Sequence, residues 1–280
     1  MANVTEIISA LEDRFEKGTE IKVQKITKAG DKEYTGIIIK PKETNITPNI
    51  YLWDGYEDEP LDKVVDKIIK AYEQYKVNGT INIDFITDWE KVKGKILIQL
   101  VNPKTNEKYL ENLVTYPFLD LTAIFYITVF VDKNSGIGNV KVRNDFLEKW
   151  GVTAEEIFNT AVENTREEVM IEDMAEMFKA MGLPVPEMDD AAPMIILSNK
   201  SKVNGAGVLP SAVEMIRERY GKCYILPSSI HEMIILPDDG NQNTEEINDM
   251  ICAVNETQLA PEEVLSNHAY YIDETEIRVA

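Results

Sequence analysis

The sequence predicts an α+β protein in two lobes. Segments with apolar residues at helical spacing are interspersed with short apolar segments rich in β-branched residues, which indicates both helices and strands. In the last third of the chain these segments follow the order β-α-β-β-α-β, the order of a ferredoxin-like sandwich. A chain of 280 residues is long enough for two domains. A proline-rich acidic segment at 183–193 predicts the boundary, with an N-terminal α+β region at 1–186 and a C-terminal α+β domain at 187–280.

The N-terminal region begins with a predicted α-β-β-β-α unit. Ile7, Leu11 and Phe15 recur at helical spacing in residues 4–17. Strand patterns follow at 21–26, 34–39 and 48–53, and the clearest helix of the region covers 61–75. Because Asn78-Gly79 ends that helix, a subdivision of the region near residue 78 stays open.

The middle of the chain combines extended and helical patterns. Extended patterns occur at 81–86, 95–101 and 119–131, and a loop of Gly, Asn and Ser is predicted at 133–139. Thr153 and Glu156 have the spacing of a capping box, so a helix is predicted to begin there. A second, acidic helix is predicted from about Glu167 to Met181.

The C-terminal domain has the most regular order of elements. Strands are predicted at 194–198, 223–227, 232–236 and 269–272, with helices at 210–220 and after a cap at Asn243 or Thr244. Gly221 is the predicted stop of the first of these helices. The ferredoxin-like order predicts one antiparallel sheet with both helices on one face.

The formal net charge of −20 is concentrated in two segments. Residues 155–190 hold 11 acidic and 2 basic side chains, and residues 232–276 hold 12 acidic side chains with no Lys or Arg. Direct binding of nucleic-acid phosphate by the C-terminal half is therefore not expected. The charge fits either solubility or an acidic face for a protein with a basic surface, including DNA mimicry. Glu245, Glu246 and Asp249 are the predicted binding residues of such a face.

The composition also restricts where the protein acts. No apolar segment approaches the ~20 residues that a membrane-spanning helix needs, so no membrane association is expected. The N-terminus lacks the basic and apolar regions of a signal peptide, which favours a cytoplasmic protein. The two cysteines, Cys223 and Cys252, form no disulfide framework and no zinc motif. His231, His268 and Glu232 make a weak two-histidine, one-carboxylate set, so we predict no metal and no cofactor.

The segment LPSSIHEMIILP at 226–237 carries a resemblance to a known family. With ILSNKSKVNGAGVL at 196–209 and VNETQLAPEEVLS at 254–266, it resembles the bacterial domain-of-unknown-function family 5688, found chiefly in gut anaerobic Gram-positive bacteria. The resemblance covers nearly the whole chain and implies a bacterial protein. It implies no activity, because the family has none that can be transferred to residues of this sequence.

The same segment holds the candidate catalytic residues Ser228, Ser229, His231 and Glu232. A catalytic histidine needs a positioned partner, but adjacent residues in a strand face opposite sides of the sheet. Neither serine lies in a Gly-x-Ser-x-Gly nucleophile elbow. We therefore interpret the segment as a hairpin turn whose hydroxyl groups bond the backbone, with His231 as a structural residue.

A second candidate is the glycine-containing segment before the helix predicted at 210–220. Asn199, Asn204, Gly205 and Gly207 follow a strand and precede a helix, which is the context of a phosphate-binding loop. The segment lacks the Lys-Ser/Thr pair of a P-loop and the third glycine of a dinucleotide fingerprint. The alternative is a tight strand-to-helix turn that requires glycine.

These patterns favour an uncharacterised cytoplasmic protein that works by contact with another protein rather than by catalysis. The strongest anomaly is the acidic surface, and no complete catalytic constellation occurs in the sequence. A role in mobile elements or against host defence is consistent with the charge. The alternative is an unrecognised hydrolase with a site around Ser228, Ser229, His231 and Glu232.

Overall fold

The computed structural model describes residues 2–77, 80, 83–132, 136–174 and 194–280. The contacts between residues divide the chain into two compact units. The first unit comprises residues 1–85 together with 128–139, and the second comprises 86–127 together with 140–280. Helices and antiparallel sheets occur in both, so the protein is α+β as predicted.

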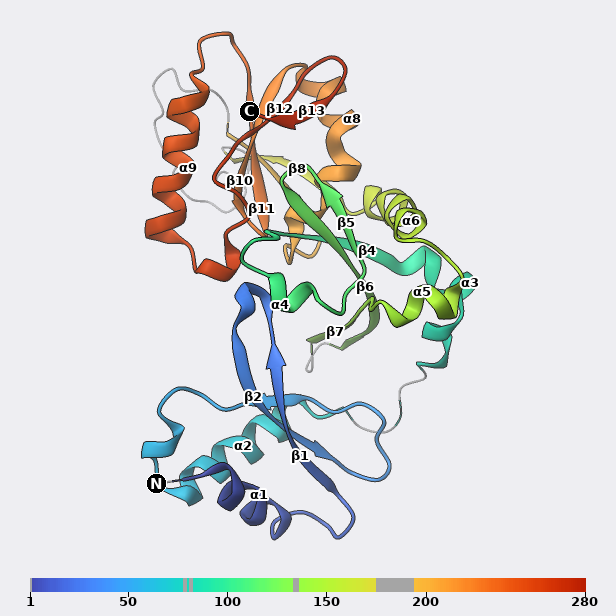
Figure 1. Ribbon diagram of the computed structural model, residues 1–280, viewed down its shortest axis with the longest axis vertical. Helices are drawn as coiled ribbons and strands as arrows, with labels where there is room; N and C mark the ends of the chain where they lie inside the picture. The colour runs from blue at the N-terminus through green and yellow to red at the C-terminus, as the bar shows by residue number, and fades with distance from the viewer. Residues whose placement is uncertain (1, 78–79, 81–82, 133–135, 175–193) are drawn as a thin grey trace. The chain divides into compact units, whose positions relative to one another are not determined.

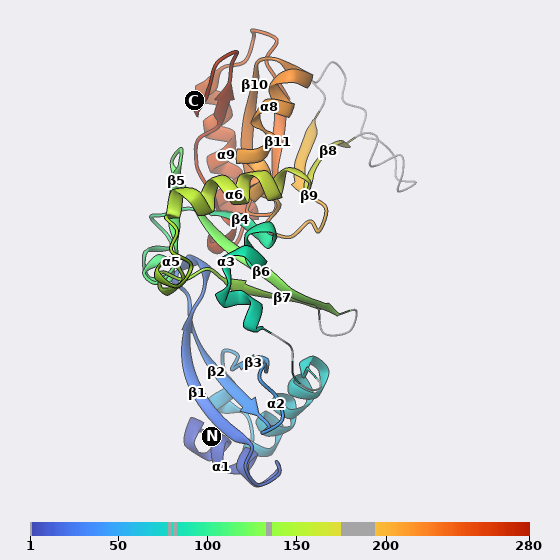
Figure 2. The same ribbon diagram turned by 90° about the vertical axis from the view of Figure 1, so that its right-hand side faces the viewer.

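The first unit has the α-β-β-β-α order that the sequence predicts. Its elements are α1 (Val4–Glu12), β1 (Glu20–Thr27), β2 (Glu33–Lys40), β3 (Asn49–Tyr51) and α2 (Leu61–Tyr75). The strands form an antiparallel sheet in the order β1-β2-β3 (Figure 1, with β3 labelled in Figure 2). Ile37 and Ile39 of β2 pack with Ile7 of α1 and Ile68 of α2 in one buried cluster, so both helices cover the same face of this sheet. The whole cluster comes from residues 2–72.

Two more sheets lie mainly in the second unit, although residues 128–132 of β6 and 136–139 of β7 are counted with the first. The first consists of β4 (Ile96–Val101), β5 (Thr115–Phe118), β6 (Leu121–Asp132) and β7 (Gly136–Lys141), with β6 paired to each of the others. Helix α6 (Ala154–Arg166) begins with the predicted capping box of Thr153 and Glu156 and lies against β4, where Asn164 Nδ2 donates to Ile96 O at 3.0 Å (Figure 2). Three short helices complete this part: α3 (Trp89–Val92), α4 (Glu107–Leu110) and α5 (Asp145–Trp150).

The second sheet has six strands in the order β13-β12-β10-β11-β9-β8, and every adjacent pair is antiparallel. The strands are β8 (Val169–Asp173), β9 (Ile195–Asn199), β10 (Cys223–Ser229), β11 (Glu232–Pro237), β12 (Tyr270–Ile272) and β13 (Ile277–Val279). Its helices are α8 (Leu209–Tyr220) and α9 (Thr244–Gln258). Short 3₁₀ helices are η1 (Ala29–Asp31), η2 (Tyr56–Asp58), η3 (Asp84–Thr87), η4 (Lys93–Lys95), η5 (Gly205–Val208) and η6 (Pro261–Glu263).

The two sheets of the second unit are connected by the carboxylate of Asp120, which lies between β5 and β6. Asp120 Oδ2 accepts a hydrogen bond from Ser266 Oγ at 2.6 Å, and Oδ1 accepts one from Tyr270 Oη at 2.8 Å. Ser266 is buried and Tyr270, on β12, is fully buried. Asn102, directly after β4, also donates from Nδ2 to Leu265 O at 2.7 Å, so two side chains next to the first sheet hold the segment that leads into the second sheet.

The predicted placement of both helices on one face of the C-terminal sheet is wrong. Tyr224 and Leu226 of β10 pack against Ile247 and Ile251 of α9, and α8 lies on the opposite side of the sheet (Figure 1). The reason is visible in β10, where residues 223–227 are all buried instead of alternating with exposed residues. A strand that is apolar on both faces needs a cover on each, so the two helices take opposite faces.

The ferredoxin-like strand arrangement is also not what the sheet shows. In a ferredoxin-like sheet the last strand lies beside the first. Here β12 pairs with β10 instead, and the edge of β9 is occupied by β8. The order of elements along the chain was correct, but the pairing partner of an edge strand is decided by tertiary contacts and not by the local pattern.

Residues 169–173 form a strand and not the start of an acidic helix, because the β-branched Val169 and Ile171 suit pairing with β9. The rest of that predicted helix and the linker at 183–193 lie outside the described residues. The loop predicted at 133–139 overlaps β7. The boundary predicted at residue 187 falls inside the second unit, where β8 and β9 pair across it, and independent folding of 187–280 stays a prediction.

Candidate functional site

His231 lies in the tight connection between β10 and β11 and takes part in four contacts that fix this turn. Its Nδ1 accepts a hydrogen bond from the backbone N–H of Asn204 at 3.3 Å. Its own backbone N–H donates to Ser229 Oγ at 3.1 Å, and its carbonyl accepts from Ser198 Oγ at 2.8 Å. Its Nε2 lies 3.8 Å from Glu263 Oε1. The histidine therefore connects the hairpin to β9, η5 and η6.

The other candidate catalytic residues are not brought to the imidazole ring. Ser229 is buried with its hydroxyl on the backbone of His231, and Ser228 lines an apolar groove described below. Among the described contacts neither hydroxyl bonds to the ring of His231, and Glu232 has no contact with that ring. Burial and the nearby carboxylate of Asp238 raise the pKa of the Cys223 thiol to about 12, so this thiol stays protonated at neutral pH. The described geometry gives the hydrolase alternative no support.

The glycine-containing segment is a close-packed junction. Asn199 closes the loop that follows β9, with Oδ1 accepting from Val203 N at 3.2 Å and Nδ2 donating to Val203 O at 2.9 Å. A Cβ on Gly205 would lie 2.1 Å from Ser198 Oγ and 2.2 Å from His231 O. A Cβ on Gly207 would lie 2.2 Å from the carbonyl oxygen of Ile98 on β4. All four residues of η5 are buried, so the glycines allow η5 to pack between the two sheets.

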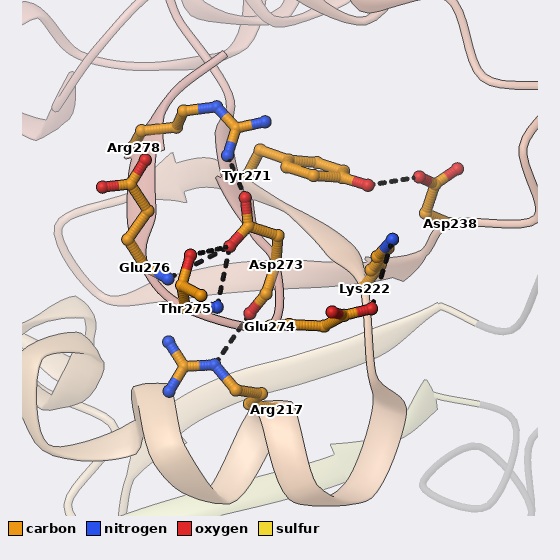
Figure 3. Close-up of polar contacts among 9 residues, drawn as sticks. All are labelled: Arg217, Lys222, Asp238, Tyr271, Asp273, Glu274, Thr275, Glu276 and Arg278. Carbon is orange, nitrogen blue, oxygen red and sulfur yellow. Dashed lines mark hydrogen bonds and ion pairs between the residues drawn. The ribbon is translucent and has the colours of Figure 1, made fainter.

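Some acidic side chains of residues 232–276 have structural partners (Figure 3). Asp273 accepts hydrogen bonds from the backbone N–H groups of Thr275 at 2.9 Å and Glu276 at 3.1 Å, and it also pairs with Arg278. These contacts hold the pKa of the Asp273 carboxyl well below its usual range. Asp238 accepts from Tyr271 Oη at 2.6 Å. These acids hold the turn between β12 and β13 and the end of β11 in place.

The acids on α9 have a different environment. Glu245, Glu246 and Asp249 are exposed, and none forms an ion pair with any residue that the structure describes. Some helical acids elsewhere have a lysine partner within one turn, as Asp145 does in its pair with Lys149 at 2.7 Å. The predicted binding residues of the acidic face therefore lie together on one helix without a neutralising cation.

Beside these acids lies an apolar groove of about 370 Å³, which we name the α9 groove. Its lining residues come from α9, from β10 and β11, and from the residue before β9: Met194, Leu226, Pro227, Ser228, Ile234, Leu236, Met250, Ile251, Val254 and Asn255. Met250 and Val254 remain 50% and 41% exposed. The sequence indicated the helical wall of this groove, because apolar residues at 247, 250, 251 and 254 make a stripe wider than one packing face. The wall from β10 and β11 depends on tertiary structure.

None of the described helices is long and apolar enough to cross a bilayer. No group of three or more His, Cys, Asp or Glu side chains in the described part of the chain is arranged to hold a metal ion.

Comparison with known proteins gives one match. The model of a family described as a family of unknown function, DUF5688, matches residues 3–274. No curated protein and no solved structure matches the chain.

Proposed function

This chain belongs to the DUF5688 family of unknown function, and from its own surface we propose that it is a non-enzymatic protein that binds a partner protein with a basic surface. The contact is made by the exposed carboxylates of α9, namely Glu245, Glu246 and Asp249. This proposal keeps the expectations of a bacterial cytoplasmic protein and of a partner other than nucleic acid. A role in mobile elements or against host defence remains a hypothesis that the charge is consistent with.

The observation that carries the proposal is the unneutralised charge on α9. Glu245 and Glu246 lie in the first turn of the helix, where a carboxylate also interacts favourably with the helix dipole. Asp249 lies beyond the first turn, so the dipole does not account for it. No Lys or Arg occurs in residues 232–276, and the field of these carboxylates is therefore not cancelled by neighbours in sequence.

The test compares two variants with the same net charge. One carries Glu245→Lys, Glu246→Lys and Asp249→Lys on α9, and the control carries Glu12→Lys, Asp13→Lys and Glu16→Lys, which are exposed in the first unit. Each immobilised full-length protein is exposed to an extract of the source cells at low salt and eluted with increasing salt. Exposed charges are screened over about 10 Å at 0.1 M, so partners of the acidic face should elute as salt rises.

The expected result is that proteins retained by the wild type and by the control variant are lost by the α9 variant. Retention of the same proteins by both variants, or retention that does not change at high salt, would contradict the proposal. Melting temperatures of the variants are measured alongside, because replacing first-turn acids by lysine costs about 0.3–1 kcal/mol each through the helix dipole.

A further inference from the structure

We infer that the α9 groove receives the apolar side chains of an amphipathic, basic segment of the partner protein. This inference rests on the proposed function and names what binds beside the acidic face. The groove has walls from two elements, with Leu226 and Ile234 on the sheet and Met250 and Val254 on the helix. Its volume of about 370 Å³ falls within the range of ligand-binding clefts.

The groove is apolar and is incompletely covered by the residues that the structure describes. Met250 and Val254 are two of the few large apolar side chains that are strongly exposed in the described residues, and both lie at its edge. An exposed apolar patch with a polar rim is typical of an interaction site. Asn255 lines the same groove, and its Oδ1 is buried without a hydrogen-bond partner among the described atoms.

The charge around the groove decides which partner fits. Glu246, Met250 and Val254 are spaced four residues apart, so they lie on one side of α9, and Asp249 adjoins Met250. A segment that places apolar side chains in the groove therefore passes next to carboxylates. Lysine or arginine on its flanks would pair with them, whereas acidic flanks would be repelled. An amphipathic helix in an apolar groove is a common mode of peptide recognition.

Other occupants fit the charge less well. A second copy of this chain carries the same net charge of −20, and an anionic lipid surface is also negative. Both would be repelled by the acids of α9. The partner that combines attraction to the carboxylates with burial of apolar side chains is a basic amphipathic segment, and the experiment uses a synthetic peptide of that chemistry.

The probe is a fluorescent peptide of about 14 residues with leucine at positions i, i+3, i+4 and i+7 and lysine elsewhere, titrated with the full-length protein. A scrambled peptide of identical composition carries the same charge without the apolar stripe. We expect the amphipathic peptide to bind about 10-fold more tightly than the scrambled one, which corresponds to about 1.4 kcal/mol. Equal binding of the two peptides would overturn the inference.

Met250→Asp and Val254→Asp each test the groove, and Val203→Asp is the matched control. Val203 is 46% exposed and does not line the groove. The added carboxylate would attract a lysine-rich peptide, so weaker binding can arise only from the lost apolar contact. We expect each groove variant to weaken binding of the amphipathic peptide about 5-fold or more and the control to leave it unchanged. Circular dichroism establishes that each variant is folded. Because Met250→Asp and Val254→Asp change the same groove at different positions, both should weaken binding.

The outcomes separate this inference from the proposed function. If the α9 charge variant loses the peptide while Met250→Asp and Val254→Asp bind it as the wild type does, binding by the acids of α9 is supported and binding in the α9 groove is refuted. If the groove variants weaken binding but the charge variant does not, a basic occupant is overturned. Light scattering of the protein alone tests the second-copy occupant, and a dimer lost in Met250→Asp would replace the inference.

Discussion

At the residue scale, substitution of His231 tests whether this side chain has a structural role in the hairpin turn. His231→Ala removes the acceptor for the Asn204 N–H, which should cost about 1–2 kcal/mol because a part-buried donor loses its partner. A loss of this size lowers the melting temperature of the protein by several degrees. The control is His268→Ala, because His268 is exposed and is the other histidine of the chain. A variant at 231 as stable as the wild type, yet unable to retain partners, would move His231 into a functional site.

Asp273 gives a prediction about acid stability. The pKa of its carboxyl is lower in the folded protein than in the unfolded chain because two backbone N–H groups and Arg278 stabilise the ionised form. Its contribution is present above the ordinary pKa of aspartate, about 3.9, and is lost as the pH falls toward the folded-state value. We expect Asp273→Asn to melt at a lower temperature than the wild type. The difference in melting temperature should be constant at pH 5–7 and should become smaller below about pH 4. A gap that does not depend on pH would refute this.

Lys141 gives a prediction in the alkaline range, where stability again rises with pH because the folded-state pKa is again lowered. Its Nζ donates to Gln99 and lies 4.9 Å from the centroid of the Tyr126 ring, and burial lowers its pKa to about 8. The unfolded chain therefore binds more protons than the folded one between about pH 8 and 10.4, so the wild type should gain stability as the pH rises through this window. Lys141→Met cannot titrate. The difference in melting temperature, wild type minus variant, should increase from pH 7 to pH 9.5 and would stay flat if the lysine were fully hydrated.

At the scale of elements, η5 shows how glycine permits two sheets to approach. Gly205→Ala and Gly207→Ala each insert a Cβ within 2.2 Å of neighbouring atoms, and Gly207 meets the backbone of β4. Overpacking of this kind costs about 1–3 kcal/mol or more, so each variant should unfold at clearly lower denaturant concentration. Gly94→Ala is the control, because its Cβ would meet nothing within 4 Å. Midpoints equal to that of the control would show that η5 can shift away from β4.

The same elements show how far the sequence could be interpreted. Helices α1, α2 and α6 were predictable because their apolar spacing and capping residues are local properties. Strand β8 was not, because Glu172 and Asp173 look like a solvated helix until β9 lies beside them. The faces of α8 and α9 also depend on contacts between distant segments. The acids of α9 were identified from composition alone. The α9 groove forms only where Leu226 of β10 and Met250 of α9 line the same cavity, and no local sequence pattern encodes that contact.

At the scale of the whole molecule, we expect isolated fragments of the two units to differ in stability. A fragment of residues 1–77 contains the complete apolar cluster of the first unit, so we expect it to unfold cooperatively by itself. A fragment of 187–280 lacks β8, which pairs with β9 through five residue pairs, and lacks β4 beside Gly207. We expect it to be less stable than a fragment of 86–280 in thermal melts. Equal melting temperatures would establish 187–280 as an independent domain.

The hydrogen bond between Asp120 and Tyr270 has a consequence for synthesis on the ribosome. The two residues are 150 positions apart, so at roughly 5–20 residues per second Tyr270 is synthesised about 8–30 s after Asp120. The first unit has no such delay, because all residues of its apolar cluster are translated before residue 73. The apolar cluster of residues 2–72 can therefore form while the strands of the second unit are still unpaired. A ribosome stalled between residues 238 and 269 would have made the apolar strands β4, β6, β10 and β11 but not β12, which covers the edge of β10.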